Sequence, residues 1–356
     1  MTGVATQRWV LHVDLDQFLA AAELLRHPEL VGRPVVVGGD GDPTKRGVVS
    51  TASYEAREHG VRSGVPLRTA AKRCPDAVFL PVDKPYYEEI STVVMATLTR
   101  TVQDVAARAV VEVLGLDEAF VAADTDDPEA VARTVQLRVR EATGLDCSVG
   151  IGQNPLQAKL ATDFGKPAGV YRLTHDTWWD VMGDRPPDAL WGIGSKTAAK
   201  LAALGVTTVR GLAAADPGAL AARFGPATGP WLVRRATGRD PSKVVDTPWV
   251  ARSRGRQVTF QEDLTDWAEV RRELLALVPV VAADVAAEGR PAVRVVVTVR
   301  WRSFRTRSHG RTLPQPTGDA ALIEAAALEA LAAFDDDDDD HDRPVRLVGL
   351  RAELSV

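Results

Sequence analysis

The stretch HVDLDQFLA, residues 12–20, places two carboxylates inside an otherwise apolar run. An alternating β-strand puts residues i and i+2 on the same face, so Asp14 and Asp16 would share one face near the middle of a domain. Like charges buried there need compensating groups close by. The run ends with Phe18 and Leu19, where the strand pattern gives way to a helical one.

Composition is that of an ordinary globular protein. The chain has 356 residues, 45% hydrophobic and 26% charged, which favours two to four domains. No apolar run reaches the roughly 18 residues of a membrane span, and the N-terminus lacks a signal pattern. The cysteines, Cys74 and Cys147, are expected to be buried thiols in a reducing cytoplasm. The six histidines form no pair at helical ligand spacing, which argues against zinc.

The charge is unevenly distributed. The net charge is −5, but seven acids lie in the run DDDDDDHD, residues 335–342, and the rest of the chain is slightly positive. Such a run is expected to be a solvated, disordered loop. Residues 290–311 contain seven arginines and no acid. A local basic surface of this kind favours a polyanionic partner despite the acidic total.

The first half of the chain alternates strand and helix patterns. Strands are predicted within 8–18, 33–50, 109–123 and 146–152, and helices over 19–30, 50–61, 65–74, 85–102 and 127–144. The helix over 50–61 is expected to start at Ser50 or Thr51 and to end at Gly60. Leaving out an insertion of residues 30–75, the order β, α, β, β, α, β resembles the split βαβ pattern.

After Lys166 the character changes. Residues 186–216 predict short helices punctuated by glycines, and residues 235–255 have the Pro, Gly and charge content of a linker. Beyond them, strands are predicted over 290–304 and 343–355, with helices over 267–287 and 320–334. This part is expected to be a separate small α+β domain.

Asp14, Asp117 and Glu118 form the first candidate site. If the strand over 8–18 lies beside the hairpin whose turn carries the other two acids, three carboxylates converge. Mg²⁺ prefers oxygen ligands and usually joins carboxylates to substrate phosphates, so a two-metal site for phosphoryl displacement is predicted. Taken singly, each acid is better explained as an exposed strand end or turn residue.

The second candidate site consists of Thr51, Tyr54 and Arg57. Their spacing of three and three predicts one helix face that offers a hydroxyl, a phenol and a guanidinium to a triphosphate. The alternative is a capping threonine on an ordinary amphipathic helix. Lys166, on a loop before a proline, is either a further phosphate contact or a surface lysine.

Two features predict contacts with a nucleic-acid backbone. GIGSKTAAKL, residues 192–201, has a Gly-x-Gly turn that opens a helix, so Gly192, Gly194 and Lys196 are candidates for phosphate contact in a helix-hairpin-helix. In VRVVVTVRWR, residues 293–302, valines alternate with polar positions whose only charged members are arginines. Arg300 and Arg302 are therefore candidate backbone contacts, although a charged face is often only solvated.

Together these motifs resemble the Y-family translesion DNA polymerases, most closely the DinB, or DNA polymerase IV-like, branch. The resemblance rests on HVDLDQF, GVVSTASYEAREHGVRSGVPL, LDEAF, SVGIGQNPLQAKLATDFGKPAG and LWGIGSKTAAKLAALGV, which occur in the family's order. It implies an α+β right-hand polymerase with a ferredoxin-like palm, small fingers, a helix-hairpin-helix thumb and an α+β little finger. The implied boundaries are 1–29 and 76–167 for the palm, 30–75 for the fingers, 168–240 for the thumb, 241–247 for a linker and 248–356 for the little finger.

The resemblance also implies site roles. Two Mg²⁺ ions, for which Mn²⁺ can substitute, would be held by Asp14, Asp117, Glu118 and the main-chain carbonyl of Leu15. The incoming nucleotide would contact Phe18, Leu19, Thr51, Tyr54, Arg57 and Lys166. Asp16 is assigned a supporting structural role rather than a metal contact.

The implied activity is template-directed nucleotidyl transfer on primer-template DNA, with deoxynucleoside triphosphates as substrates and no proofreading, in a cytoplasmic monomer. Leu19 stands where relatives carry an aromatic ring under the sugar, so ribonucleotide use is also predicted. Two further departures are Gly115 in place of a frequent serine and the absence of a C-terminal clamp-binding peptide. A nucleotide cyclase and a catalytically inactive DNA-bound adaptor are the alternatives.

Overall fold

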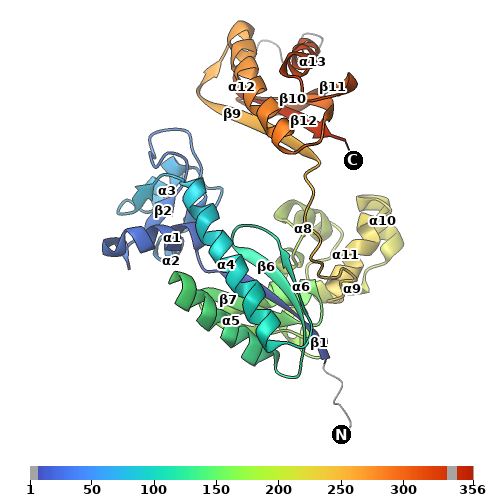
Figure 1. Cartoon of the computed structure of the whole chain (residues 1–356). Helices are drawn as coiled ribbons and strands as arrows, with labels where there is room; N and C mark the ends of the chain where they lie inside the picture. Colours follow the sequence, from blue (N-terminus) through green and yellow to red (C-terminus); the bar gives the residue numbers. More distant parts are fainter. Residues whose placement is uncertain (1–6, 335–342, 356) are drawn as a thin grey trace. The chain divides into compact units, whose positions relative to one another are not determined.

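The computed structural model describes residues 7–334 and 343–355, and these form two compact units (Figure 1). Unit 1 comprises the residues up to Pro43 and Gly47–Thr247, and unit 2 comprises Thr44–Arg46 and the residues from Pro248 onward. Within the described ranges, no helix is both long and apolar enough to cross a membrane.

Unit 1 is built on a five-stranded sheet with the order β5-β6-β1-β7-β8. Its strands are β1 (Gln7–Leu15), β5 (Ala109–Val113), β6 (Glu118–Thr125), β7 (Cys147–Gly152) and β8 (Val170–Arg172). The central strand β1 pairs antiparallel with both β6 and β7. With α4 (Lys84–Val105) and α5 (Pro128–Thr143), these strands give the split βαβ topology that the sequence predicted.

Helices cover both faces of this sheet. On one face α4 and α5 pack side by side (Figure 1), and the alternate β1 residues Leu11, Val13 and Leu15 are buried in the same hydrophobic cluster as residues of both helices. The other face is covered by α6 (Pro155–Gly165). Close approach requires Gly150 on β7, because a Cβ there would lie 2.0 Å from the carbonyl oxygen of Ala158.

A small sheet with the order β3-β2-β4 lies in the segment that follows β1. The elements of this segment are α1 (Phe18–Arg26), η1 (Pro28–Leu30), β2 (Val35–Val37), β3 (Thr51–Ala52), α2 (Tyr54–Glu58), α3 (Leu67–Arg73) and β4 (Val78–Leu80). The predicted helix start at Ser50 or Thr51 is wrong. Thr51 lies on β3, and the hydroxyl of Ser53 caps α2 by accepting a hydrogen bond from the amide of Ala56.

The rest of unit 1 is helical. It contains α7 (Trp178–Met182), η2 (Pro187–Ala189), α8 (Ser195–Ala202), α9 (Val209–Ala214), α10 (Pro217–Phe224) and α11 (Thr228–Ala236). These short helices share a core that includes Trp178, Leu190, Ile193 and Leu201. The turn between η2 and α8 has Gly192 at φ 91°, a left-handed conformation that favours glycine.

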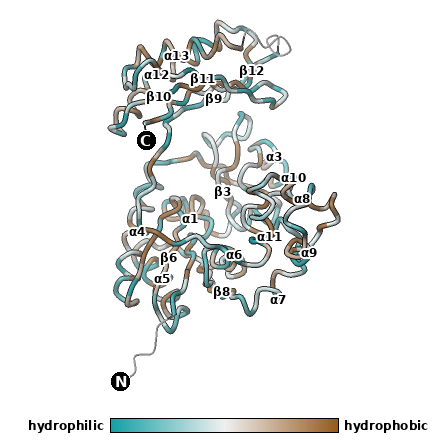
Figure 2. Tube along the Cα trace, turned by 90° about the vertical axis from the view of Figure 1, so that its right-hand side faces the viewer, coloured by the Kyte–Doolittle hydropathy of each residue, from teal (hydrophilic) through white to brown (hydrophobic). Residues whose placement is uncertain are grey.

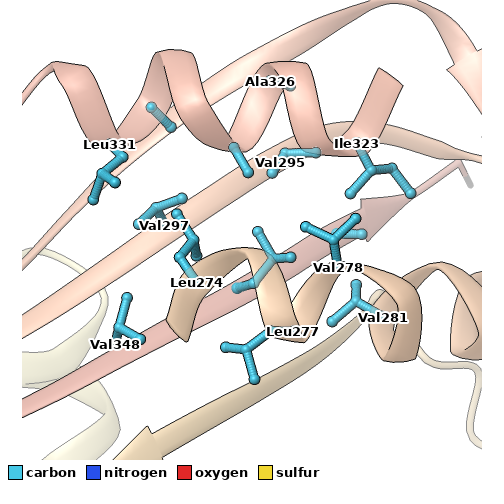
Figure 3. Packing of buried hydrophobic residues seen from close by; sticks show 14 of the residues in the cluster. Leu274, Leu277, Val278, Val281, Val295, Val297, Ile323, Ala326, Leu331 and Val348 are labelled. Carbon is cyan, nitrogen blue, oxygen red and sulfur yellow. The ribbon is translucent and has the colours of Figure 1, made fainter. Parts of the chain in front are cut away.

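Unit 2 is a four-stranded antiparallel sheet with the order β11-β10-β12-β9. Its elements are β9 (Ser253–Leu264), α12 (Trp267–Ala287), β10 (Ala292–Trp301), β11 (Thr306–Thr317), α13 (Ala320–Ala332) and β12 (Val345–Leu354). Side chains of α12 and α13 pack against β10 and β12 (Figure 3). Brown hydrophobic and teal hydrophilic stretches alternate along both helices (Figure 2), as expected of elements that bury one face.

The sequence predicted β10, β12 and both helices of unit 2 but missed β9 and β11. Both missed strands are edge strands of the sheet, and both are mostly polar and solvent-exposed. Edge strands lack the apolar alternation of central ones, which leaves little periodic signal. The acidic run 335–342 lies outside the described residues.

Candidate active site

The three predicted carboxylates meet where β1 ends beside the β5–β6 hairpin. Asp14 is the direct cross-strand partner of Glu118 in the antiparallel register. The amide of Leu15 donates a hydrogen bond of 2.8 Å to the carbonyl of Asp117, and this bond fixes the hairpin turn against the strand. The structure therefore brings Asp14, Asp117 and Glu118 together at one end of the sheet.

Two of the three carboxylates have cationic partners from the α6 segment. The ammonium of Lys166 lies 2.8 Å from Asp14 Oδ1. Glu118 pairs with the ammonium of Lys159, and its Oε2 atom lies 3.1 Å from His12 Nε2. Asp117 has no salt bridge to any residue that the structure describes. The sequence analysis did not single out His12 or Lys159, although His12 precedes Asp14 by two residues and so shares its face.

These partners separate the ionisation of two neighbouring carboxyl groups. The hydrogen bond from His12, together with Lys159, lowers the pKa of Glu118 to about 2. Burial, and then the negative charges of Asp14 and Glu118, raises the pKa of Asp117. Burial also lowers the pKa of His12, which favours the neutral imidazole. Asp117 is thus the carboxylate whose charge is least compensated.

The donor set suits a hard divalent cation. His12, Asp14 and Glu118 each offer a ligand atom, and these three atoms lie within 4.8 Å of one another. Carboxylate oxygens are the ligands that Mg²⁺ prefers, and such a cation would offset the negative charges of Asp14 and Glu118, which add to the effect of burial in raising the pKa of Asp117. The imidazole of His12 is already engaged, because its Nδ1 lies 2.8 Å from the hydroxyl of Thr162.

Tyr54 and Arg57 lie side by side next to the end of β1. The guanidinium of Arg57 stacks 4.9 Å from the centre of the Tyr54 ring, and its Nε donates to the carbonyl of Ala52. The Tyr54 hydroxyl donates a 2.6 Å hydrogen bond to Asp16 Oδ1. Thr51 does not share their helix face, because it pairs with Val37 in the small sheet.

Asp16 is a buried acceptor for groups from three segments. Besides Tyr54, it accepts hydrogen bonds from the Ser148 hydroxyl on β7 and from the amide of Ala168, the latter at 2.8 Å. Ala168 has a left-handed φ of 51° and lies two residues after Lys166. Asp16 therefore ties α2 and the loop after α6 to the end of β1, consistent with a supporting role.

Phe18 and Leu19 open helix α1 in different environments. The ring of Phe18 is only 3% exposed and meets Tyr87 edge-on, with centroids 6.3 Å apart. Leu19 is partly buried and packs against the edge of the same core. Phe18 is thus committed to the core, whereas Leu19 keeps an accessible surface.

The Gly-x-Gly turn lies between η2 and α8, as predicted. Gly194 caps α8, and a Cβ added to it would meet no atom within 4 Å, so the backbone there is open. Lys196 is exposed in the first turn of the helix. The turn begins at Trp191, whose ring lies 6.1 Å from Phe120 on β6 and 5.4 Å from the ammonium of Lys159. Trp191 was not singled out from the sequence.

In unit 2, the polar face of β10 is less uniformly cationic than the sequence predicted. Arg302, 77% exposed, lies 3.8 Å from Asp263 on β9, and Arg294 lies 3.4 Å from Glu353 on β12. Arg300 bonds instead to the hydroxyl of Thr306. Other strands of the sheet supply these acids, which a single strand's pattern does not show.

Comparison with known proteins gives consistent matches. The impB/mucB/samB family profile matches residues 13–163, and the profile for its C-terminal domain matches residues 251–354. DNA polymerase IV 2 of Mycobacterium tuberculosis is 48% identical over 355 residues, covering 99% of each chain. DNA polymerase IV of Methanoculleus marisnigri is 38% identical over 354 residues, covering 98% of this chain and 94% of that protein.

Solved structures agree with the sequence matches. The Y-family DNA polymerase chimera Dbh-Dpo4(243-245)-Dbh superposes with a TM-score of 0.82 at 26% identity, covering 97% of this chain and 98% of that one. The insertion ternary complex of Dbh DNA polymerase has a TM-score of 0.63 at 25% identity and covers 98% and 99% of the two chains. These matches extend over nearly the whole chain.

Proposed function

Because the chain belongs to the Y family of DNA polymerases, in its DinB-like branch, we propose that it extends DNA primers across damaged templates by two-metal nucleotidyl transfer. It is a DNA-directed DNA polymerase. The observation that carries the proposal is the register of Asp14 opposite Glu118, with Asp117 bonded to the same strand end. This arrangement favours catalysis over a non-catalytic adaptor, which would not need three converging carboxylates.

Asp14, Asp117 and Glu118, with the carbonyl of Leu15, would hold two divalent cations, Mg²⁺ or Mn²⁺. When bound, such ions activate the attacking 3′-hydroxyl and stabilise the leaving pyrophosphate. The carboxylates suit this task because Glu118 stays ionised at any working pH. The repulsion around Asp117 supplies a further driving force for a cation to bind there.

Arg57 and Lys166 would bind the triphosphate as charged donors, with Tyr54 beside them. The Tyr54 hydroxyl has one proton, which it donates to Asp16, so a phosphate contact from that hydroxyl requires the proton to change acceptor. Thr51 would approach the triphosphate from β3 rather than from the helix. The ternary complexes named among the structural neighbours support nucleotide and primer-template DNA as ligands.

We assign residues 1–29 and 76–167 to a palm, 30–75 to fingers, 168–240 to a thumb and 248–356 to a little finger. Gly192, Gly194 and Lys196 on the thumb, and Arg300 and Arg302 on the little finger, would contact DNA phosphates. Among the described residues, His12, Asp14 and Glu118 form the one group of three or more potential metal ligands, which leaves no second site for an exonuclease there, so synthesis would proceed without proofreading and be mutagenic. The protein would act in the cytoplasm as a monomer.

Leu19 would give weak discrimination against ribonucleotides. An aromatic ring under the incoming sugar rejects a 2′-hydroxyl by collision, and leucine is smaller and non-planar at that place. Phe18 cannot replace the missing ring, because its side chain packs in the core against Tyr87. Losing a clash of about 3–4 kcal/mol removes a few hundredfold of selectivity, at about 1.4 kcal/mol per tenfold.

Primer extension with Mg²⁺ tests both levels of the proposal. Asp117→Ala should abolish extension with every nucleotide. Leu19→Phe should suppress ribonucleotide insertion far more than deoxyribonucleotide insertion, whereas Leu25→Phe, on an exposed leucine of the same helix, should change neither. If the protein instead converts a nucleoside triphosphate into a cyclic nucleotide without a template, its function is that of a nucleotide cyclase and the polymerase assignment is refuted. Strong deoxyribonucleotide preference in the unmodified protein, unchanged by Leu19→Phe, would refute the assignment of Leu19.

A further inference from the structure

Two lysines of the α6 segment each hold one of the candidate metal ligands. Lys159 lies within α6 and Lys166 caps its C-terminal end, seven residues later, so both project from about the same side of the helix. Lys166 pairs with Asp14 at 2.8 Å, and Lys159 pairs with Glu118. One helix thus supplies a counterion to each of two carboxylates.

Both pairs are shielded from solvent. The four side chains are 17–27% exposed, in contrast to the surface pair between Lys84 and Glu88, where both are at least half exposed. Lys159 is further enclosed by the Trp191 ring at 5.4 Å and by His12 Nε2 at 3.2 Å. Partly buried pairs of this kind are screened less by water and salt than surface pairs, so breaking them has a measurable cost.

We propose that Lys159 and Lys166 are internal counterions that compete with divalent metal ions for Glu118 and Asp14. A bound triphosphate takes Lys166 as its own partner, so that Lys166 no longer competes with the metal ion for Asp14. An ammonium and a metal ion both bind through the same carboxylate oxygens, so one weakens the other. This inference rests on the proposed function, in which Lys166 binds the triphosphate.

The two lysines should therefore behave differently. When phosphate oxygens bind Lys166, Asp14 becomes free for a cation, so nucleotide and metal promote each other's binding. This promotion must be reciprocal, because it is a coupling between two binding equilibria. Lys159 lies against Trp191 and pairs with Glu118, and the proposed function gives it no contact with the triphosphate. It should oppose metal binding whether or not nucleotide is present.

Binding of Mn²⁺ to the full chain, measured by electron paramagnetic resonance without DNA, tests this. Without nucleotide, Lys166→Gln and Lys159→Gln should each raise Mn²⁺ affinity up to about fivefold, the effect of one modest ion pair. With a deoxynucleoside triphosphate present, Lys166→Gln should reduce the nucleotide-induced gain in Mn²⁺ affinity several-fold, and Lys159→Gln should retain that gain. Lys84→Gln, which breaks the surface pair, should match the unmodified protein.

Unchanged Mn²⁺ affinity in both lysine variants would overturn the proposal, as would an equal loss of coupling in both. Lys159→Met keeps the apolar contact with Trp191 and serves if the glutamine variant does not fold. The variant Asp117→Asn shows whether a failed test refutes the competition by the lysines or the metal site itself. If Asp117→Asn leaves Mn²⁺ binding intact, the metal site itself is misassigned. If that variant loses binding while the lysine variants match the unmodified protein, only the competition is refuted.

Discussion

Neutralising two adjacent acids should change stability in opposite directions. In the presence of EDTA at pH 7, Asp117→Asn should stabilise the protein slightly, and Glu118→Gln should destabilise it. The reason is their unequal compensation: Glu118 has both Lys159 and His12, whereas Asp117 faces Asp14 and Glu118 without a salt bridge among the described residues. A neutral amide at 117 relieves repulsion, and one at 118 breaks an ion pair.

The magnitudes follow from the pKa shifts. Lowering a carboxyl pKa from 4.5 to about 2, as at Glu118, corresponds to an upper bound of about 3 kcal/mol. The Glu118 side chain is 27% exposed, and solvent screening reduces the expected loss to about 1–2 kcal/mol. For Asp117→Asn, removal of a like-charge contact should add between zero and about 1 kcal/mol.

The pH dependence has a defined sign. The pKa of Glu118 is lowered on folding, so its stabilising effect is complete above pH 4.5 and is lost as the pH falls toward about 2. The pKa of Asp117 is raised, so its destabilising effect is present at neutral pH and disappears as the carboxyl takes up a proton. Below about pH 4 the gain from Asp117→Asn should therefore vanish.

Urea unfolding of the full chain in EDTA, at pH 7 and pH 3.5, measures these differences. Adding Mg²⁺ gives a second comparison, because it should stabilise the unmodified protein more than it stabilises Asp117→Asn. Equal destabilisation by both variants at pH 7 would refute the unequal compensation of the two acids. A gain from Asp117→Asn that persists at pH 3.5 would show that charge repulsion is not its cause.

Two further predictions concern DNA contacts. Gly192→Ala should cost about 1–2 kcal/mol of stability and weaken DNA binding, because residue 192 is left-handed and a Cβ there would lie 3.0 Å from the Trp231 ring. The matched control Gly194→Ala should leave stability unchanged, because a Cβ at residue 194 meets no atom within 4 Å. Urea unfolding and a DNA-binding titration measure these effects, and equal stability losses at the two glycines would contradict the geometry. Replacing Arg300 and Arg302 together by alanine should weaken binding of all DNA sequences alike and flatten the plot of log affinity against log salt by about one unit per lost phosphate contact. Replacing the exposed Arg133 and Arg138 on α5 is the matched control, and an unchanged slope in the first variant would exclude Arg300 and Arg302 as phosphate contacts.

The sequence predicted those parts of the fold whose periodicity is strong. Strand β1, the long helix α4 and the acidic hairpin were predicted because alternating or 3.6-residue apolar patterns continue over many residues. The start of α2 was misplaced because Ser50, Thr51 and Ser53 are all good capping residues, and only the pairing of Thr51 with Val37 decides between them. Pairing between strands far apart in sequence is not a local signal.

The same limit explains the missed site residues. His12, Lys159 and Trp191 come from a strand, a helix and a turn, and each alone is a common residue in a common place. They become a cluster only because Gly150 lets α6 approach the sheet, which brings Lys159 to Glu118 and Trp191 to Lys159. Spacing along one element predicts neighbours on that element and not neighbours across the core.

The two carboxylates of HVDLDQFLA do not share a strand face as the sequence predicted, because β1 ends at Leu15 and Asp16 lies in the turn after it, and each has its own partner. His12 and Asp14, on one face of β1, meet Thr162 and Lys166 of the α6 segment, and Asp16, after the strand, meets the amide of Ala168 in the loop after α6. Strand and helix thus run past each other with matched polar groups, which is why two nearby acids are tolerated. Asp14, opposite Glu118, is placed to bind a cation. Asp16, past the strand end, already accepts hydrogen bonds from Tyr54 and Ser148, so its role is to hold these groups in place.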